Sequence, residues 1–318
     1  MRLRFSVSAI SISMMVLAAN GVLSQDYPSK PIRIVTSVPG GGSDFAARII
    51  AQGISGPLGQ QVIVDNRPGI LGQEIVIKAP PDGHTLIVDG ASLWIAPLVQ
   101  TTSYDVMRDF SPVVLVARVP NILVVHPSLP VKSVKDLIAL AKARPGDLNF
   151  ASGNPGSAAQ ISGELFNMMA GVNIARINYK GTGTAVNDLL GGHVQLMFAT
   201  PGSVTALMKS GRLRGLAVTS AQPSPLVPGM PTLAASGVPG YETGSATGVF
   251  APAKTPAAII NRLNREIVQV LNRPDVKEKF FSVGVEPAGS SPEEFAAAIK
   301  SDVIKIGKVV KAAGIRND

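Results

Sequence analysis

Short apolar runs alternate with helical patterns along most of the chain, and this alternation limits the possible folds more than any other feature. Strand candidates lie at 32–35, 61–64, 85–88 and 113–117, and an amphipathic stretch at 43–58 follows the first of them. Such alternation predicts a parallel sheet covered by helices on both faces. A length of 318 residues, 46% of them hydrophobic, is enough for two such units.

A second series of strands and helices follows Pro127. A capping box at 133–136 starts its first helix, Ser157 caps the next helix, and Gly171 ends it. The apolar run 121–125 can leave the first series and enter the second. We therefore predict an α/β fold with two lobes, the first formed by 25–124 together with 250–318 and the second by 125–249.

The first 24 residues have the features of an export signal. Arg2 and Arg4 precede an uncharged run at 5–23, and the small residues at its end make an acceptable cleavage site. An uncleaved anchor is the alternative, because such a run is close to the lower length for spanning a bilayer. Several serines dilute its hydrophobicity, so we predict a signal peptide at 1–24, cleaved near Ser24, and a periplasmic protein.

Composition argues against several kinds of partner and reaction. The chain has no cysteine, so it needs no disulfide and has no thiol to carry a lipid anchor. Its net charge is +8, but Lys and Arg are scattered with few aromatic residues between them, so nucleic acid is a poor partner. The three histidines fit no recognisable catalytic or zinc-binding spacing. We therefore assign no catalytic residue, no metal and no cofactor, and do not expect an enzyme.

A glycine-rich turn, VPGGGSD at 38–44, lies between the first strand and the first helix. Its three glycines let a ligand approach the backbone closely. The first N–H groups of the helix have no intrahelical partner and can bind a carboxylate or a phosphate. The turn lacks the lysine of a P-loop and the spacing of a dinucleotide fingerprint. A plain tight turn capped by Ser43 is the alternative. The predicted ligand contacts are Pro39, Gly40, Gly41, Gly42, Ser43 and Asp44, with helix stabilisation as the other role for Asp44.

A second turn of the same kind, SGNPGS at 152–157, lies between a strand and a helix of the second series. One such turn is commonly structural, but one in each lobe favours a clamp that holds a single anion between two helix starts. A further strand ends at the same sheet edge with Tyr179, Lys180 and Gly181, for which a solvated surface is the alternative. The predicted contacts of the second turn are Ser152, Gly153, Asn154, Gly156 and Ser157.

These turns belong to an ordered set of motifs that runs over essentially the whole mature chain. The set consists of 27–32, 39–44, 65–69, 81–83, 148–152, 179–181, 188–192, 216–220, 238–242 and 250–256. It resembles the tripartite tricarboxylate transporter substrate-binding proteins, also called the Bug or TctC type.

The resemblance implies a type II periplasmic-binding-protein fold, in which two α/β lobes joined by two crossing strands enclose a ligand cleft. It also implies capture of a small organic acid and its delivery to membrane transporter subunits. A monomer is expected. By motif, the contacts would further include Ser92, Ala199 and Thr200. A ligand-sensing periplasmic protein that feeds a signalling partner is the main alternative, and a periplasmic hydrolase is a more remote one.

The chain departs from the family pattern at three places near the cleft. The motif at 65–69 continues with ILGQ at 70–73 instead of a Gly-Gly-Asn run, and Ala199-Thr200 replaces a pair that usually contains asparagine. A tryptophan common in the family corresponds to Ala246. These changes bear on the identity of the ligand, and the small side chain at 246 predicts room for a bulkier acid, including an aromatic one.

Overall fold

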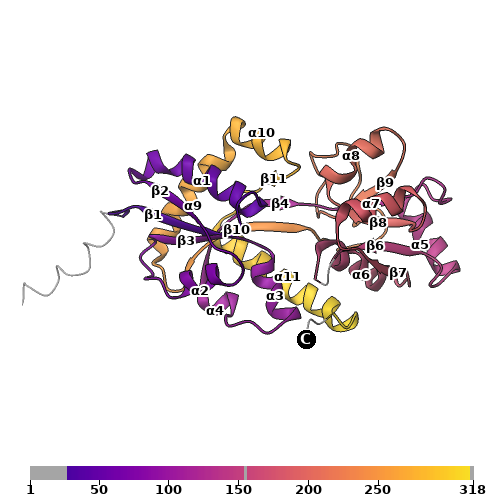
Figure 1. Ribbon diagram of the computed structural model, residues 1–318, viewed down its shortest axis with the longest axis horizontal. Helices are drawn as coiled ribbons and strands as arrows, with labels where there is room; N and C mark the ends of the chain where they lie inside the picture. Colours follow the sequence, from indigo (N-terminus) through magenta and orange to yellow (C-terminus); the bar gives the residue numbers. More distant parts are fainter. Residues whose placement is uncertain (1–26, 154–155, 316–318) are drawn as a thin grey trace, which may run out of the picture.

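The structure is a computed structural model that describes residues 27–153 and 156–315. The predicted signal peptide at 1–24 and the predicted contact Asn154 therefore lie outside the described residues. Within the described part the chain forms two α/β lobes side by side, each built on one sheet (Figure 1). No helix of this part is both long enough and apolar enough to cross a membrane.

The sheet of the first lobe has six strands. In spatial order they are β11 (Glu286–Pro287), β4 (Phe110–Val119), β10 (Ser245–Pro252), β3 (Thr85–Gly90), β1 (Ile32–Thr36) and β2 (Val62–Asn66). β1 pairs in parallel with both β2 and β3, whereas β10 is antiparallel to β3 and β4. The sheet is therefore mixed and not parallel throughout as predicted, because β10 returns from the second lobe instead of following a helical crossover.

Helices cover both faces of this sheet, and the strands alternate between two core clusters. Ile34 of β1 belongs to one cluster and its neighbour Val35 to the other. This alternation follows from the two-residue repeat of a strand whose two faces are both buried. The first face carries α1 (Gly42–Leu58), α9 (Ala257–Asn272) and α10 (Pro274–Ser282). The second carries α2 (Leu71–Ile77), α3 (Ser92–Val99), α4 (Val106–Asp109) and α11 (Pro292–Ala312).

The second lobe repeats this arrangement on a five-stranded sheet. Its spatial order is β7 (Ala175–Asn178), β6 (Asn149–Ser152), β8 (Leu196–Ala199), β5 (Ile122–Val125) and β9 (Arg214–Val218). β6 is parallel to β7 and β8, and β5 is antiparallel to β8 and β9. One face packs on α5 (Val134–Ala143) and α6 (Ala158–Ala170), and the other on α7 (Thr182–Leu190) and α8 (Pro201–Lys209).

Three of the helix starts are capped by the serines that the local sequence marks. Ser133 and Ser291 form capping boxes, and Ser157 caps α6 by accepting from the backbone N–H of Gln160. At α1, however, the N-cap is Gly41 and no side chain caps the helix. Ser43 is therefore not the cap that the alternative interpretation required, and its hydroxyl is available for other contacts.

The chain passes between the lobes twice, and α11 contacts both of them. β4 ends at Val119 in the first sheet and β5 begins at Ile122 in the second, while β10 carries the chain back (Figure 1). α11 packs on the first lobe through Phe295 and reaches the core of the second lobe through Val309. The exact lobe boundaries, with 25–124 and 250–318 in the first lobe and 125–249 in the second, stay our proposal.

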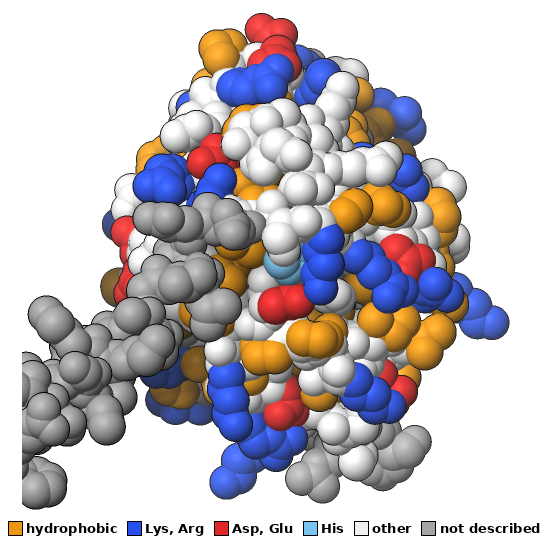
Figure 2. All heavy atoms as spheres, turned by 90° about the vertical axis from the view of Figure 1, so that its left-hand side faces the viewer, with side chains coloured by type: hydrophobic (Ala, Val, Ile, Leu, Met, Phe, Trp, Pro, Cys, Tyr) orange, Lys and Arg blue, Asp and Glu red, His pale blue; other side chains and the backbone are white. Residues whose placement is uncertain are grey.

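Charged side chains are dispersed over the end of the first lobe. Figure 2 views the molecule from the left of Figure 1 and shows Lys and Arg side chains in several separate groups among acidic and hydrophobic ones. The positive charge of the chain is therefore spread over this face and not gathered in one patch.

Candidate ligand-binding cleft

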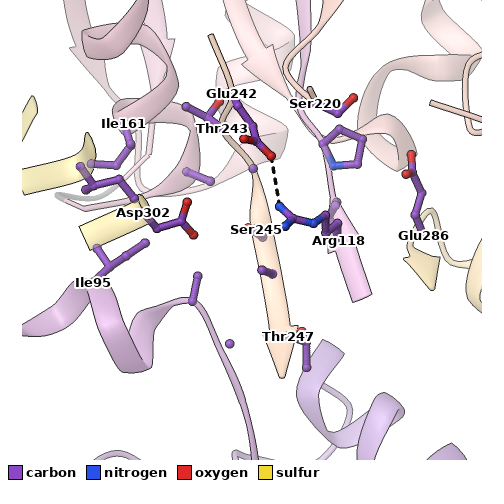
Figure 3. A pocket seen from close by; sticks show the side chains of 18 of the residues that line it. Ile95, Arg118, Ile161, Ser220, Glu242, Thr243, Ser245, Thr247, Glu286 and Asp302 are labelled. Atoms are coloured by element: carbon purple, nitrogen blue, oxygen red, sulfur yellow. Dashed lines mark hydrogen bonds and ion pairs between the residues drawn. The ribbon is translucent and has the colours of Figure 1, made fainter. Parts of the chain in front are cut away.

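A cavity of about 680 Å³ lies between the two lobes. The first lobe contributes the starts of α1 and α3, and the second lobe contributes 220–223 and the start of α6. The crossing segments add the ends of β4 and β10 on the side of the second lobe, and α11 closes one end (Figure 3). Every part of the molecule that joins the lobes thus reaches this space.

Three helix N-termini line the cavity. Gly42 and Ser43 open α1, Ser92 opens α3, and Gly156 and Ala158 flank the cap of α6. The first backbone N–H groups of a helix have no partner within it and carry partial positive charge. The cavity therefore offers donors from both lobes to a single anion.

Two serine hydroxyls converge beside Gly90 at the end of β3. A Cβ built on Gly90 would lie 3.7 Å from Ser92 Oγ, 4.0 Å from Ser43 Oγ and 3.7 Å from the carbonyl oxygen of Ala246. Because glycine has no side chain, this space stays open between the hydroxyls. Ala246 also lines the cavity, at the position where the sequence predicted room for a bulkier acid.

Asp44 orders the glycine turn and does not line the cavity. Its carboxylate accepts from the backbone N–H of Gly40 at 2.9 Å and from Asn66 Nδ2 at 2.8 Å, and it pairs with Arg48 at 3.0 Å. Burial raises its pKa, but the hydrogen bonds from Arg48, Asn66 and Gly40 and the charge of Arg48 outweigh burial and lower the pKa to about 2. Of the two roles left open, these contacts favour stabilisation of the turn.

The lowered pKa of Asp44 predicts a specific loss of stability in acid. Because the folded pKa lies below the ordinary value of 3.8, the stabilisation is complete above about pH 5 and is lost as the pH falls toward 2. The free energy of unfolding of the wild type should fall by about 2 kcal/mol more than that of Asp44→Asn over this range. Urea unfolding of both proteins at several pH values measures the difference, and parallel curves would contradict the prediction.

In the second turn, one of the predicted residues lines the cavity, and three others lie next to it without lining the cavity. Gly156 lines the cavity and its N–H donates to Gln160 Oε1 at 2.8 Å. Ser157 is the cap of α6, Ser152 is buried at the end of β6, and a Cβ on Gly153 would lie 3.2 Å from Ser157 Oγ. Their direct contact with a ligand stays a prediction.

The other predicted residues do not line the cavity in this conformation. Tyr179 donates its hydroxyl to Asp188 Oδ2 at 2.8 Å, which occupies its polar group. Ala199 is buried at the end of β8, and the Thr200 hydroxyl lies 3.2 Å from Ser203 Oγ. Their contact with a ligand therefore remains untested, as does that of Pro39, Gly40, Gly41, Lys180 and Gly181.

A charged group near the crossing strands was not predicted. Arg118 Nη1 lies 3.3 Å from Glu242 Oε1, and Lys305 Nζ lies 3.5 Å from Glu242 Oε2. Asp302, one turn before Lys305 on α11, accepts from Trp94 Nε1 at 3.2 Å. These residues come from four distant segments, so no local motif could have marked them. In the described residues, no group of three or more His, Asp or Glu side chains is placed to hold a metal ion.

Residues 46–315 match the family described as the tripartite tricarboxylate transporter family receptor, TctC. The chain belongs to this family. Protein BugT of Bordetella pertussis is 36% identical over 302 residues, which cover 93% of this chain and 93% of BugT. The predicted resemblance to the Bug and TctC type is thereby confirmed. This is a family of solute-binding receptors and not a family of enzymes.

Solved structures of similar proteins have the same two-lobed fold. R. palustris Rpa4515 with adipate is 38% identical, with a TM-score of 0.68 over 92% of this chain and 99% of that one. A TctC solute binding protein from Polaromonas, solved without ligand, is 26% identical, with a TM-score of 0.83 over 90% and 99%. The predicted type II binding-protein fold is confirmed.

Proposed function

We propose that this chain is an extracytoplasmic solute-binding protein that captures a small organic carboxylate in the interlobe cavity. The observation that carries the proposal is the meeting of the α1, α3 and α6 starts with two serine hydroxyls around one space. A charge-assisted hydrogen bond contributes about 1.5–3 kcal/mol, so two or three of them suit micromolar capture after the cost of association. The adipate in a 38% identical structure supports the same ligand class.

Closure of the lobes would bring the second turn onto the ligand. The structure is more similar to the ligand-free Polaromonas protein than to the adipate complex, although the sequence is closer to the latter. This difference between structural and sequence similarity supports an open arrangement of the lobes, in which Tyr179 and Thr200 do not line the cavity. On closure, the donors of α6 would complete the anion site.

Delivery to a membrane transporter of the tripartite tricarboxylate type is the corresponding physiological role. We further propose that the protein acts in the periplasm after removal of its signal near Ser24, as a monomer and without turnover. The family to which the chain belongs supports this role.

Isothermal titration with a panel of mono- and dicarboxylates tests the ligand class. We expect one ligand per monomer and a melting temperature that rises with ligand concentration. At a ligand concentration of 100 times Kd, the ligand should increase the free energy of unfolding by about 2.7 kcal/mol. The amides of the same acids are the matched controls, and they should bind at least about tenfold more weakly because they lack the charge. If no carboxylate binds, or if the amides bind equally well, the proposal is wrong.

A further inference from the structure

Asp302 of α11 directs its carboxyl group into the cavity beside Ile95 and Ile161 (Figure 3). It lies where both lobes and α11 meet. A carboxyl group in a cavity proposed for an anion needs an explanation, because like charges in one site repel each other.

The carboxyl group of Asp302 is held by a buried partner. Trp94 donates its indole N–H to Oδ2 at 3.2 Å, and the Trp94 side chain is only 1% exposed. The other oxygen, Oδ1, has no hydrogen-bond partner among the described residues. One acceptor of a fixed carboxyl group thus remains available to a ligand.

The two cations near Asp302 share one acidic partner, Glu242. Arg118 and Lys305 both pair with Glu242, and Lys305 also donates to the backbone oxygen of Glu242 at 3.2 Å. Among the described residues, the charged side chains that line the cavity are two basic and three acidic ones, a net charge of −1 when all are ionised: Arg118, Lys305, Glu242, Glu286 and Asp302. A second carboxylate of a ligand would therefore enter a set of side chains whose net charge is negative.

The surroundings of Asp302 raise the pKa of its carboxyl group above the ordinary value. Burial raises its pKa and the charge of Glu242 adds to this, while the Trp94 hydrogen bond and the charges of Lys305 and Arg118 act in the opposite direction. A carboxylate that has lost part of its hydration gains more from a well-placed donor than one in water does.

We infer that Asp302 recognises a hydrogen-bond donor on the ligand, so that the bound molecule is a hydroxy- or amino-carboxylic acid and not a dicarboxylate. The inference rests on the proposed function, because the helix starts must hold the carboxylate. It adds a second contact, made by α11, that selects among carboxylates by the group at the other end of the molecule.

Matched sets of ligands test this inference in the wild type. Each set has one carbon skeleton with a carboxylate at one end and a carboxylate, a hydroxyl or an ammonium group at the other. The sets are succinate with 4-hydroxy- and 4-aminobutanoate, adipate with 6-hydroxy- and 6-aminohexanoate, and terephthalate with 4-(hydroxymethyl)- and 4-(aminomethyl)benzoate. In the set that fits the cavity, the hydroxy or amino acid should bind about 10- to 100-fold more tightly than the dicarboxylate. Comparison of the hydroxy acid with the amino acid in each set shows whether Asp302 recognises a hydroxyl or an ammonium group.

The variant Asp302→Asn tests the residue itself. Asparagine has nearly the same shape and can still accept from Trp94, but its amide then presents a donor in place of an acceptor. The preference should therefore fall at least about tenfold or reverse in favour of the dicarboxylate. Glu293→Gln, on the exposed first turn of the same helix, makes the same change of charge away from the cavity and should alter no affinity by more than about twofold.

The outcomes separate this inference from the proposed function. A wild type that binds the dicarboxylate as tightly as its partners overturns the role of Asp302 but leaves carboxylate capture standing. A preference that persists in Asp302→Asn overturns the assignment to this residue. If no carboxylate of any set binds, the proposed function itself fails.

Discussion

Replacing Ser43 with aspartate is expected to lower carboxylate affinity by at least about 100-fold while leaving the protein as stable as the wild type. Ser43 is the second residue of α1 and lines the cavity, where its hydroxyl converges with that of Ser92 beside Gly90. An aspartate there would place a negative charge where the ligand carboxylate is proposed to lie. The same charge in the first turn of a helix interacts favourably with the helix dipole.

The opposite signs of the two effects make the Ser43 prediction informative. A variant that bound poorly because it had unfolded would show a lower melting temperature, whereas Ser43→Asp should match or exceed the wild type. Ser43→Asn is the matched control, because it has a similar size without the charge, and it should lose no more than about tenfold. Titration and thermal unfolding of the three proteins provide the comparison. Unchanged carboxylate affinity in Ser43→Asp would show that the anion lies elsewhere.

Replacing Phe295 with alanine is expected to cost about 3–5 kcal/mol of unfolding free energy. Phe295 is 1% exposed, its ring centroid lies 4.9 Å from that of Phe250 and 5.9 Å from that of Trp94, and it fills the space above Gly248. A Cβ on Gly248 would lie 2.1 Å from the Phe295 ring, so α11 approaches β10 as closely as it does only because residue 248 is a glycine. Removal of the ring would leave a cavity between α11 and the sheet.

Urea unfolding measures the effect of Phe295→Ala. Phe281→Ala is the control, since Phe281 is 38% exposed on α10, and it should cost less than about 1 kcal/mol. A loss below about 1 kcal/mol for Phe295→Ala would mean that α11 is not anchored by this contact. The Phe295 ring packs against Trp94, and Trp94 donates a hydrogen bond to Asp302. The variant should therefore also weaken the preference for hydroxy or amino acids over dicarboxylates.

Much of the fold could be read from local patterns. A strand buried on both faces needs a continuous apolar run, and the run at 32–35 became β1. Ser133 and Ser157 begin their helices as predicted because a cap depends on neighbours three residues away. The direction of β10 was missed, because pairing with β3 and β4 depends on how the chain returns between lobes.

The residues of the candidate site could be predicted only where they lie in a turn and in the helix that directly follows it. Gly42, Ser43 and Gly156 line the cavity because the end of a parallel strand and the start of the next helix are adjacent in the chain. Asp44 could not be assigned, since its partners include Asn66 at the end of β2, 22 residues away in the chain. A carboxylate in a helix start has the same sequence signature whether it orders a turn or contacts a ligand.

The sequence by itself determined two α/β units, some of their helix caps, the two glycine-rich turns and membership of a receptor family, because each depends on residues close together in the chain or on their order. Only the tertiary structure decided which side chains meet in the cavity. Trp94 and Asp302 are 208 residues apart, and Arg118 and Glu242 are 124 apart. Contacts over such separations arise from the packing of α11 and the crossing strands, for which no local pattern exists.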